Sequence, residues 1–388
     1  MLPKILLLSD IFPPKTGGSG RWFWEIYSRL PRDRVVVAAG EVPGADAFDL
    51  THDLKTLRLP IEMRTRGIRS FRNLKHYWRL ASRVGTIIDS EGITAIHCAR
   101  NLPEAFVAYL VQKRRGTAYL CYAHGEDIGV SSTSRELAWM TRRAFAGASL
   151  VIANSQNTRD MLLNEWNLPE SKVRLFTPGV DTRRFAPAPP EESIRAELGW
   201  TGRTVLLTVG RLQKRKGQDC LIRALTEIRR THPHVLYAVL GDGDELPQLK
   251  ALAEAEGVSE CVQFLGEASD ETLLRCYRQC DLFVLPNRTI GKDCEGFGMV
   301  LLEAQACGKP VVAGASGGTA ETMRIPETGR VVACDTPGPL AALLTELLSD
   351  PVELRAMGDR GREWVCARFD WDALSRRAAE LFSEFPRP

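Results

Sequence analysis

The chain has 388 residues, 44% hydrophobic and 26% charged, with a formal net charge of +3 at pH 7. These values are typical of a soluble globular protein of two or three domains and exclude a low-complexity chain. The charge is uneven: residues 1–180 carry 25 basic and 17 acidic side chains, and the remainder carries 26 and 31. The basic first half indicates an anionic partner, although the small total gives no reason to expect nucleic acid.

Ten cysteines are scattered along the chain, without a Cys-x-x-Cys pair or a histidine at zinc-like spacing. We interpret them as reduced thiols of a cytoplasmic protein, most of them buried as small hydrophobic side chains. The apolar run at residues 5–8 is too short for a signal peptide core or a membrane span and is better explained as part of a buried strand.

A glycine-rich loop with Gly17 and Gly18 joins this first strand to a helix predicted from about Arg21 to Leu30. Strand, glycine-rich loop and helix form the phosphate sites of doubly wound α/β sheets. The loop lacks the lysine of a Walker motif and the spacing of a dinucleotide fingerprint. A flexible turn and a ligand-binding loop therefore both remain open.

The rest of the first half alternates between predicted strands and helices. One strand ends in His124, a polar residue at the carboxyl end of a predicted parallel strand, where α/β proteins bind ligands. A structural histidine is about as plausible as a functional one. Ser155 is expected to cap the helix that follows the last strand of this half. The further strands are predicted at 34–39, 57–61 at an edge, 93–98, 117–123 and 150–155.

The segment 64–83 contains seven basic residues and no acidic one. Within it, Phe71, Leu74 and Trp78 form one apolar stripe at helical spacing, beside a basic stripe. Such a helix can lie on an anionic membrane surface. Alternatively, it packs its apolar stripe on the sheet and leaves its charges in water.

Four prolines within residues 178–193 mark a linker and a domain boundary. We therefore expect domains at 1–180 and 181–369 and a terminal helix at 370–388. Alternating strands and helices on both sides of the linker predict parallel sheets. In the second half, strands are predicted at 204–209, 235–240, 261–265, 282–286 and 310–313, and helices at 219–230, 245–256 and 270–279.

A basic loop follows the first strand of the second half. Arg211 and Lys216 are five residues apart on it, and two fixed cations can hold a diphosphate and stabilise it as a leaving group. A solvated basic turn is the alternative, and Lys214 and Arg215 are interpreted in that way. No Asp-x-Asp pair is expected where a metal would bridge the diphosphate, so we expect the cations to replace a metal.

Two acidic residues, Glu295 and Glu303, bracket a glycine-rich loop and the predicted start of a helix near Gly298. Unpaired amides at a helix start suit a phosphate, and glycines let a ligand approach the backbone. The acids would repel a second phosphate, so sugar hydroxyls are their expected partners. An ordinary loop with two surface glutamates is the alternative. The amides available to a ligand are those of Gly296, Phe297, Gly298 and Met299.

These motifs together resemble the retaining glycosyltransferases of family 4, in particular the bacterial phosphatidylinositol mannosyltransferases. The most specific part is the segment from Glu295 to Glu303 with the following Gly-x-Pro-Val-Val at 308–312. The resemblance implies the GT-B fold, two doubly wound Rossmann-like domains facing a central cleft. It also implies GDP-mannose as donor, a lipid-linked or polysaccharide acceptor, and a protein on the inner face of the cytoplasmic membrane.

The resemblance further implies roles for individual residues. Arg211 and Lys216 would bind the donor diphosphate, Glu303 the ribose and Glu295 the transferred hexose. Gly17 and Gly18 would close over the phosphate, His124 would lie near the sugar and acceptor, and the segment around Leu265 would contact the base. The terminal helix would cross back to the first domain, and no metal or other cofactor is expected.

Other functions remain open at this stage. A transferase using UDP-glucose or UDP-N-acetylglucosamine with a soluble acceptor fits the same motifs. A nucleotide-sugar epimerase on the same fold fits less well, because it does not explain the spacing from Glu295 to Glu303 with Arg211 and Lys216. A nucleotide-binding module without activity is disfavoured, since every expected polar position is filled.

Overall fold

The computed structural model describes residues 2–15 and 17–384. The chain divides into two compact units. The first unit is Met1–Pro178 together with Trp371–Pro388, and the second is Gly179–Asp370. The boundaries predicted from the sequence lie after residues 180 and 369.

The first unit contains a seven-stranded sheet whose paired strands are all parallel, in the order β3-β2-β1-β4-β5-β6-β7. The predicted edge strand is at the edge, as β3. The expectation that 150–155 forms the last strand of this half is wrong, because a further strand, β7 (Val173–Leu175), pairs with β6 (Leu150–Ala153). The strands are β1 (Ile5–Ser9), β2 (Val35–Gly40), β3 (Thr56–Leu59), β4 (Ala95–Cys98), β5 (Ala118–Ala123), β6 (Leu150–Ala153) and β7 (Val173–Leu175).

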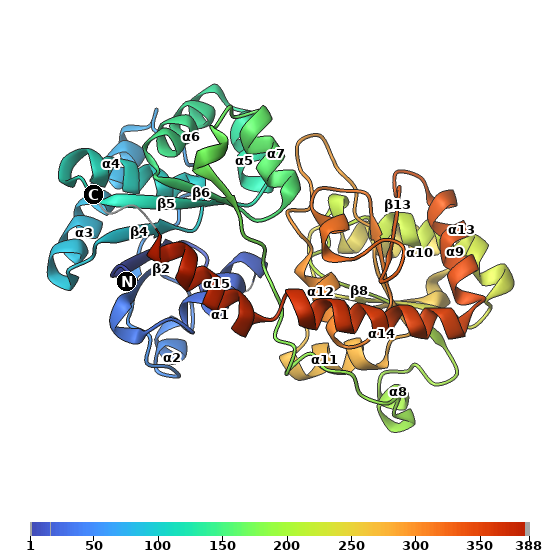
Figure 1. Cartoon of the computed structure of the whole chain (residues 1–388). Coiled ribbons are helices and arrows are strands. Elements are labelled where there is room, and N and C mark those ends of the chain that lie inside the picture. The colour runs from blue at the N-terminus through green and yellow to red at the C-terminus, as the bar shows by residue number, and fades with distance from the viewer. Residues whose placement is uncertain (1, 16, 385–388) are drawn as a thin grey trace. The chain divides into compact units, whose positions relative to one another are not determined.

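Both faces of this sheet are buried, which explains why its strands are nearly continuous apolar runs. Alternate side chains, such as Leu6 and Leu8, pack on one face against α3, α4 and α6. On the other face, Phe382 of α15 contacts Tyr27 of α1 and His97 of β4, and α15 runs beside α1 (Figure 1). The helices are α1 (Gly18–Tyr27), α2 (Ala45–Asp49), α3 (Phe71–Glu91), α4 (Phe106–Arg115), α5 (Glu126–Ser132), α6 (Arg135–Gly147), α7 (Gln156–Asn164) and α15 (Trp371–Ser383).

Local signals account for several of these helix boundaries. α1 begins three residues before its predicted start, because the chain enters the helix directly after Gly17, whose φ of 153° suits glycine. Ser155 caps α7 as predicted, since its side chain accepts a hydrogen bond from the Thr158 N–H at 3.1 Å.

The second unit contains a six-stranded parallel sheet in the order β10-β9-β8-β11-β12-β13. Helices α9, α10 and α13 cover one face, α11 and α12 cover the other, and α14 contributes side chains to both clusters. The strands are β8 (Thr204–Val209), β9 (Val235–Leu240), β10 (Val262–Gly266), β11 (Leu282–Leu285), β12 (Val311–Gly314) and β13 (Arg330–Val332). The helices are α8 (Glu192–Glu197), α9 (Gln218–Thr231), α10 (Leu246–Ala255), α11 (Asp270–Gln279), α12 (Met299–Ala306), α13 (Pro337–Leu348) and α14 (Pro351–Arg368).

The apolar stripe of the basic segment does not pack on the sheet. α3 buries a different face, which includes Tyr77, Leu80 and Val84. Phe71 is 79% exposed and Trp78 41% exposed. The packing interpretation of this stripe is therefore wrong, because the helix has a second apolar face that fills the core.

Candidate active site

The second unit has its strand order reversed between the neighbours β8 and β11. Parallel α/β sheets bind ligands beyond the carboxyl ends of the strands at such a point. The loops that follow these two strands, residues 210–217 and 286–298, are in close contact. Gly217 has a φ of 71°, and a Cβ atom there would lie 1.8 Å from the Pro286 carbonyl oxygen. A side chain at this position would therefore separate the two loops.

Glu295 is the centre of this site. Its Oε2 accepts hydrogen bonds from Lys216 Nζ at 2.5 Å and from Arg215 Nη1 at 2.7 Å. Burial raises the pKa of the Glu295 carboxyl, but the charges and hydrogen bonds of Lys216 and Arg215 outweigh burial, so the pKa lies below its usual value. Glu295 is therefore ionised at neutral pH.

Arg215 was interpreted from the sequence as a solvated residue, and this interpretation is wrong. Its side chain is 11% exposed, and its Nε also lies 3.2 Å from an Asp293 carboxylate oxygen. Asp293 and Glu295 on the opposing loop hold the Arg215 side chain inside the site. Because both acids are far from Arg215 in the sequence, no local pattern indicates this contact. Lys214, its neighbour on the same turn, is exposed as expected.

The main chain of Glu295 is fixed by a turn after β12. The Glu295 N–H donates to Ser316 Oγ at 3.3 Å, and its carbonyl accepts from the Gly318 N–H at 3.0 Å. Gly317, with a φ of 55°, leaves no room for a Cβ atom, which would lie 1.9 Å from the Glu295 carbonyl oxygen. The Ser316 hydroxyl also contacts Thr289 Oγ1 at 3.0 Å. Glu295 is thus held on a rigid backbone.

Helix α12 begins directly after Gly298, whose φ is 95°, as the sequence predicts. Phe297 is 3% exposed, and its ring lies 6.0 Å from that of Phe369, so only its backbone is available to a ligand. Gly296 and Met299 flank this helix start.

Glu303 lies just over one turn inside α12 and is 8% exposed. Its Oε2 accepts a hydrogen bond from the Tyr277 hydroxyl at 2.7 Å. Burial and the Glu303 charge raise the pKa of Tyr277, so the phenol remains a donor. Tyr277 thus orients Glu303. Sequence analysis missed it because it belongs to α11, 26 residues earlier.

Arg211 and Leu265 lie at the carboxyl ends of β8 and β10, the two strands that flank β9 in the second unit. Arg211, after β8, is exposed, and none of the ion pairs among residues 2–15 and 17–384 includes its side chain. Leu265 is half-buried at the end of β10. Gly241 connects the two ends: it lies against the Gly210 carbonyl, and its N–H donates to the Gly266 carbonyl at 2.8 Å.

An Asp-x-Asp triplet, Asp242–Asp244, follows β9 and contacts the Arg211 loop through backbone, where Leu212 N–H donates to the Asp242 carbonyl at 3.0 Å. Both aspartates are exposed, and the Asp242 carboxylate accepts the Gly243 N–H. Within the described part of the chain, no group of three or more His, Cys, Asp or Glu residues is arranged to hold a metal.

A second missed pair supports the same loops. Arg288, after β11, forms two parallel hydrogen bonds of 2.9 Å with the Asp219 carboxylate at the start of α9. Such a bidentate pair fixes both partners. The pair joins the β11 loop to the helix that follows Lys216. The sequence contains Arg288 in a motif but gives no signal for this partner.

In the first unit, His124 is buried at the end of β5. Its Nε2 lies 2.8 Å from the Ala99 carbonyl, which can only accept, so Nε2 carries the proton. Nδ1 is then the acceptor and faces Ser19 Oγ at 3.5 Å. Burial lowers the pKa of His124, so it is neutral at pH 7. The rings of Trp22 and Phe23 on α1 hold it edge-to-face, and α1 begins at Gly17 and Gly18.

The same edge of the sheet carries a buried acidic pair that sequence analysis missed. The Asp10 N–H donates to Glu104 Oε1 at 2.9 Å. Burial and the Asp10 charge raise the pKa of Glu104 well above its usual value. Asp10 and Glu104 follow β1 and β4, which are the strands where the order of this sheet reverses.

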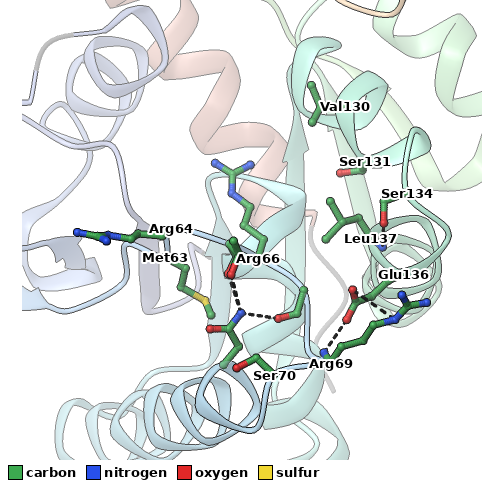
Figure 2. Close-up of a pocket in the computed structure, with 13 residues that line it drawn as sticks. Met63, Arg64, Arg66, Arg69, Ser70, Val130, Ser131, Ser134, Glu136 and Leu137 are labelled. Carbon is green, nitrogen blue, oxygen red and sulfur yellow. Dashed lines mark hydrogen bonds and ion pairs between the residues drawn. The ribbon is translucent and has the colours of Figure 1, made fainter.

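A pocket of about 620 Å³ lies in the first unit between the loop before α3 and the helices α5 and α6 (Figure 2). Its loop is held by Glu136 Oε1, which accepts the N–H groups of Ile68 and Arg69 at 2.7 Å. Neither Arg64 nor Arg66 has an ion pair within the described residues. The remaining lining is Met63, Thr65, Gly67, Ser70, Asn73, Val130, Ser131, Ser134 and Leu137.

Over 98% of its length the chain superimposes on Anabaena Alr3699/HepE solved with UDP, with a TM-score of 0.83, 23% identity and 99% of that chain covered. It therefore has the GT-B fold of glycosyltransferases. Two family models match: Glycosyltransferase Family 4 over residues 16–184, and Glycosyl transferases group 1 over residues 190–364.

Curated relatives are similar over the whole length. The chain is 33% identical over 390 residues to the GDP-mannose-dependent alpha-(1-6)-phosphatidylinositol monomannoside mannosyltransferase of Mycolicibacterium smegmatis, covering 98% of each chain. It is 31% identical to the monoacylated-lipid counterpart of Corynebacterium glutamicum, covering 99% of each. This protein belongs to glycosyltransferase family 4 and is a glycosyltransferase, which confirms the resemblance found in the sequence.

Proposed function

We propose that this protein is a retaining, metal-independent mannosyltransferase that moves mannose from GDP-mannose to a lipid-linked acceptor of the phosphatidylinositol mannoside type. The observation that carries the proposal is the cluster of Lys216, Arg215 and Glu295 at the strand reversal of the second unit, beside the start of α12. The full-length similarity to GDP-mannose-dependent enzymes supports the choice of sugar.

Each donor group has a suitable partner in the second unit. Arg211 and Lys216 would bind the diphosphate, and the amides from Gly296 to Met299 would support it. Glu303, oriented by Tyr277, would accept the ribose hydroxyls. Glu295 would face the hexose, and the base would contact the backbone near Leu265.

The chemistry follows from charge. As the glycosidic bond breaks, negative charge develops on the diphosphate, where two fixed cations stabilise it. The leaving phosphate takes the acceptor proton, so no strong protein base is required. In the first unit, Gly17, Gly18 and neutral His124 are proposed substrate contacts, with His124 Nδ1 as an acceptor of a hydrogen bond from a hydroxyl.

We propose that no metal takes part, because Arg211 and Lys216 supply the charge that a divalent ion would neutralise. The test is to assay transfer after treatment with a chelator. Full activity is expected, and activity restored only by adding a divalent ion would contradict this step.

The acceptor side of the proposal is the first unit. Arg64 and Arg66 beside the 620 Å³ pocket are suited to an anionic head group. The exposed stripe of Phe71, Leu74 and Trp78 is suited to the surface of an anionic membrane. Within the described residues, no helix is long and apolar enough to span a bilayer. From the exposed stripe of α3, we propose a cytoplasmic protein that binds the membrane peripherally.

A second candidate is a transferase that uses a UDP sugar and a soluble acceptor. It is favoured by 35% identity over 249 residues to the D-inositol 3-phosphate glycosyltransferase of Corynebacterium jeikeium, which is named for a soluble acceptor. That match covers 62% of this chain and 58% of the relative, less than the matches to mannosyltransferases.

Thermal unfolding in a panel of GDP, UDP and ADP sugars distinguishes the candidates. GDP-mannose is expected to raise the Tm most, and radiolabelled mannose is then expected to be transferred to added phosphatidylinositol monomannoside, which gives a labelled dimannoside. Selective stabilisation by a UDP sugar, with transfer to inositol phosphate, would replace the first proposal by the second.

A further inference from the structure

In the second unit, two cations share a single carboxylate oxygen. Lys216 and Arg215 both donate to Glu295 Oε2, and all three side chains are only 11–12% exposed. These are the charge-assisted contacts that a diphosphate oxygen would make with the same cations. The Glu295 carboxylate therefore occupies Lys216, which the proposed donor needs.

Donor binding consequently requires an exchange of partners. A diphosphate that approaches Lys216 competes with Glu295 for the ammonium group. A carboxylate that is buried cannot be left without a partner, because losing its hydrogen bonds costs the full penalty of desolvation. Arg215 remains as a second donor to Glu295, and its contact with Asp293 holds it in position.

The exchange needs no movement of the main chain. Ser316 and Gly318 fix the backbone of Glu295, and the Arg288–Asp219 pair fixes the loop after β11. Only the long, flexible side chain of Lys216 has to turn away from Glu295. The site can therefore pass between the two pairings at small cost.

We propose that Glu295 is the internal counter-ion of Lys216 in the unliganded protein, and that Arg215 is a positioning residue that holds Glu295 when Lys216 transfers to the donor diphosphate. This inference rests on the proposed function, because it requires a nucleotide-diphosphate donor. Competition from Glu295 weakens the binding of the nucleoside diphosphate product and so favours its release.

Isothermal titration of the full chain with GDP tests the inference. Glu295→Gln is expected to bind GDP about tenfold more tightly, because one charged competitor is removed. Arg215→Gln is expected to bind about tenfold more weakly, because Glu295 then depends on Lys216 alone. Lys214→Gln is the matched control: it removes one charge from the same turn, and GDP affinity is expected to stay unchanged.

The double variant separates an indirect from a direct effect. If Arg215 acts through Glu295, Arg215→Gln has no further effect in the Glu295→Gln background. An equal loss of affinity in both backgrounds means that Arg215 contacts the diphosphate itself and overturns the inference. GDP affinity that is unchanged or weaker in Glu295→Gln also overturns it.

If the Glu295→Gln variant does not fold, two further measurements still test the inference. With Glu295 intact, Arg215→Gln must weaken GDP binding while Lys214→Gln does not. Arg215→Gln must also move the acidic limb of the pH–kcat profile to higher pH, since Glu295 loses one of the charges that lower its pKa. An unmoved limb overturns the inference.

Failure of the proposed function gives a different result. Wild-type protein that binds neither GDP nor UDP overturns the proposed function and the inference with it. If wild-type protein binds UDP in place of GDP, the same titrations of the variants are carried out with UDP. Normal binding with unchanged affinity in the Glu295 and Arg215 variants overturns the inference alone.

Discussion

The basic side chains around Glu295 in the second unit and those beside the pocket of the first unit differ in how their charges are compensated. In the second unit, Lys216, Arg215 and Arg288 hold carboxylates at hydrogen-bonding distance. In the first unit, Arg64 and Arg66 beside the pocket have no ion pair within the described residues. Buried charges need internal partners, whereas exposed ones are solvated. The difference indicates a preorganised site for a small donor and an open surface for a larger, amphiphilic acceptor.

The largest expected effect is on the second unit's chemistry. Glu295→Ala should reduce transfer by about a thousandfold, on the scale of removing a group that stabilises the transition state. GDP should still bind, because Arg211 and Lys216 remain. The sequence alone predicts a donor affinity that is mostly unchanged, whereas the ion pair with Lys216 predicts a tighter one. Wild-type turnover in this variant would remove Glu295 from the mechanism.

The next largest effect is expected from removing Arg211 and Lys216, the two cations proposed to bind the diphosphate. Arg211→Ala with Lys216→Ala should weaken GDP binding by about 3 kcal/mol, or more than a hundredfold, because two charge-assisted contacts are lost. Calorimetric titration measures this, with Lys214→Ala as the control. An unchanged titration would contradict the diphosphate site.

The paired carboxylate should make stability depend on pH. The pKa of Glu295 is lower in the folded protein than its usual value of 4.5, so its contribution is present above about pH 4.5 and is lost as the pH falls through the folded pKa. Wild type should therefore exceed Glu295→Gln by about 2 kcal/mol in unfolding free energy at pH 7. Urea denaturation across this range measures the difference, and a gap that persists at the lowest pH would argue against the pairing.

For the open surface, Arg64→Gln with Arg66→Gln should raise the KM for the lipid acceptor about tenfold and leave the donor KM unchanged. Steady-state kinetics with each substrate varied in turn measure both values. Arg34→Gln with Lys113→Gln removes the same charge from the first unit outside the pocket and serves as the control. Equal effects of the two pairs would mean that only net charge matters.

The smallest effect should be on membrane contact. Phe71→Ser with Trp78→Ser should reduce flotation with anionic vesicles about threefold at low salt, because the apolar stripe is lost. Leu50→Ser with Val352→Ser replaces two exposed apolar side chains elsewhere and is the control. If wild-type protein does not bind anionic vesicles at low salt, the stripe has another role.

Local signals made much of the second unit predictable. The glycine before α12, the apolar strands and the basic loop are all contained in short segments. The roles of Tyr277, Arg288 and Ser316 were not predictable, because each acts on a residue more than 20 positions away. α13 and α14 were also missed, since they carry no site motif. In the first unit, the segment 64–83 has two apolar faces, and spacing alone does not say which one is buried.

The sequence by itself determined that the chain alternates strands and helices, that it belongs to family 4, and that Glu295 and Glu303 flank a helix start. These properties depend on residue order and on short-range backbone preferences. Only the tertiary structure decided that Arg215 turns inward to Glu295 and that Phe71 and Trp78 face outward. Both depend on which surfaces meet when the sheet forms, because a side chain's partner is set by packing between elements distant in sequence.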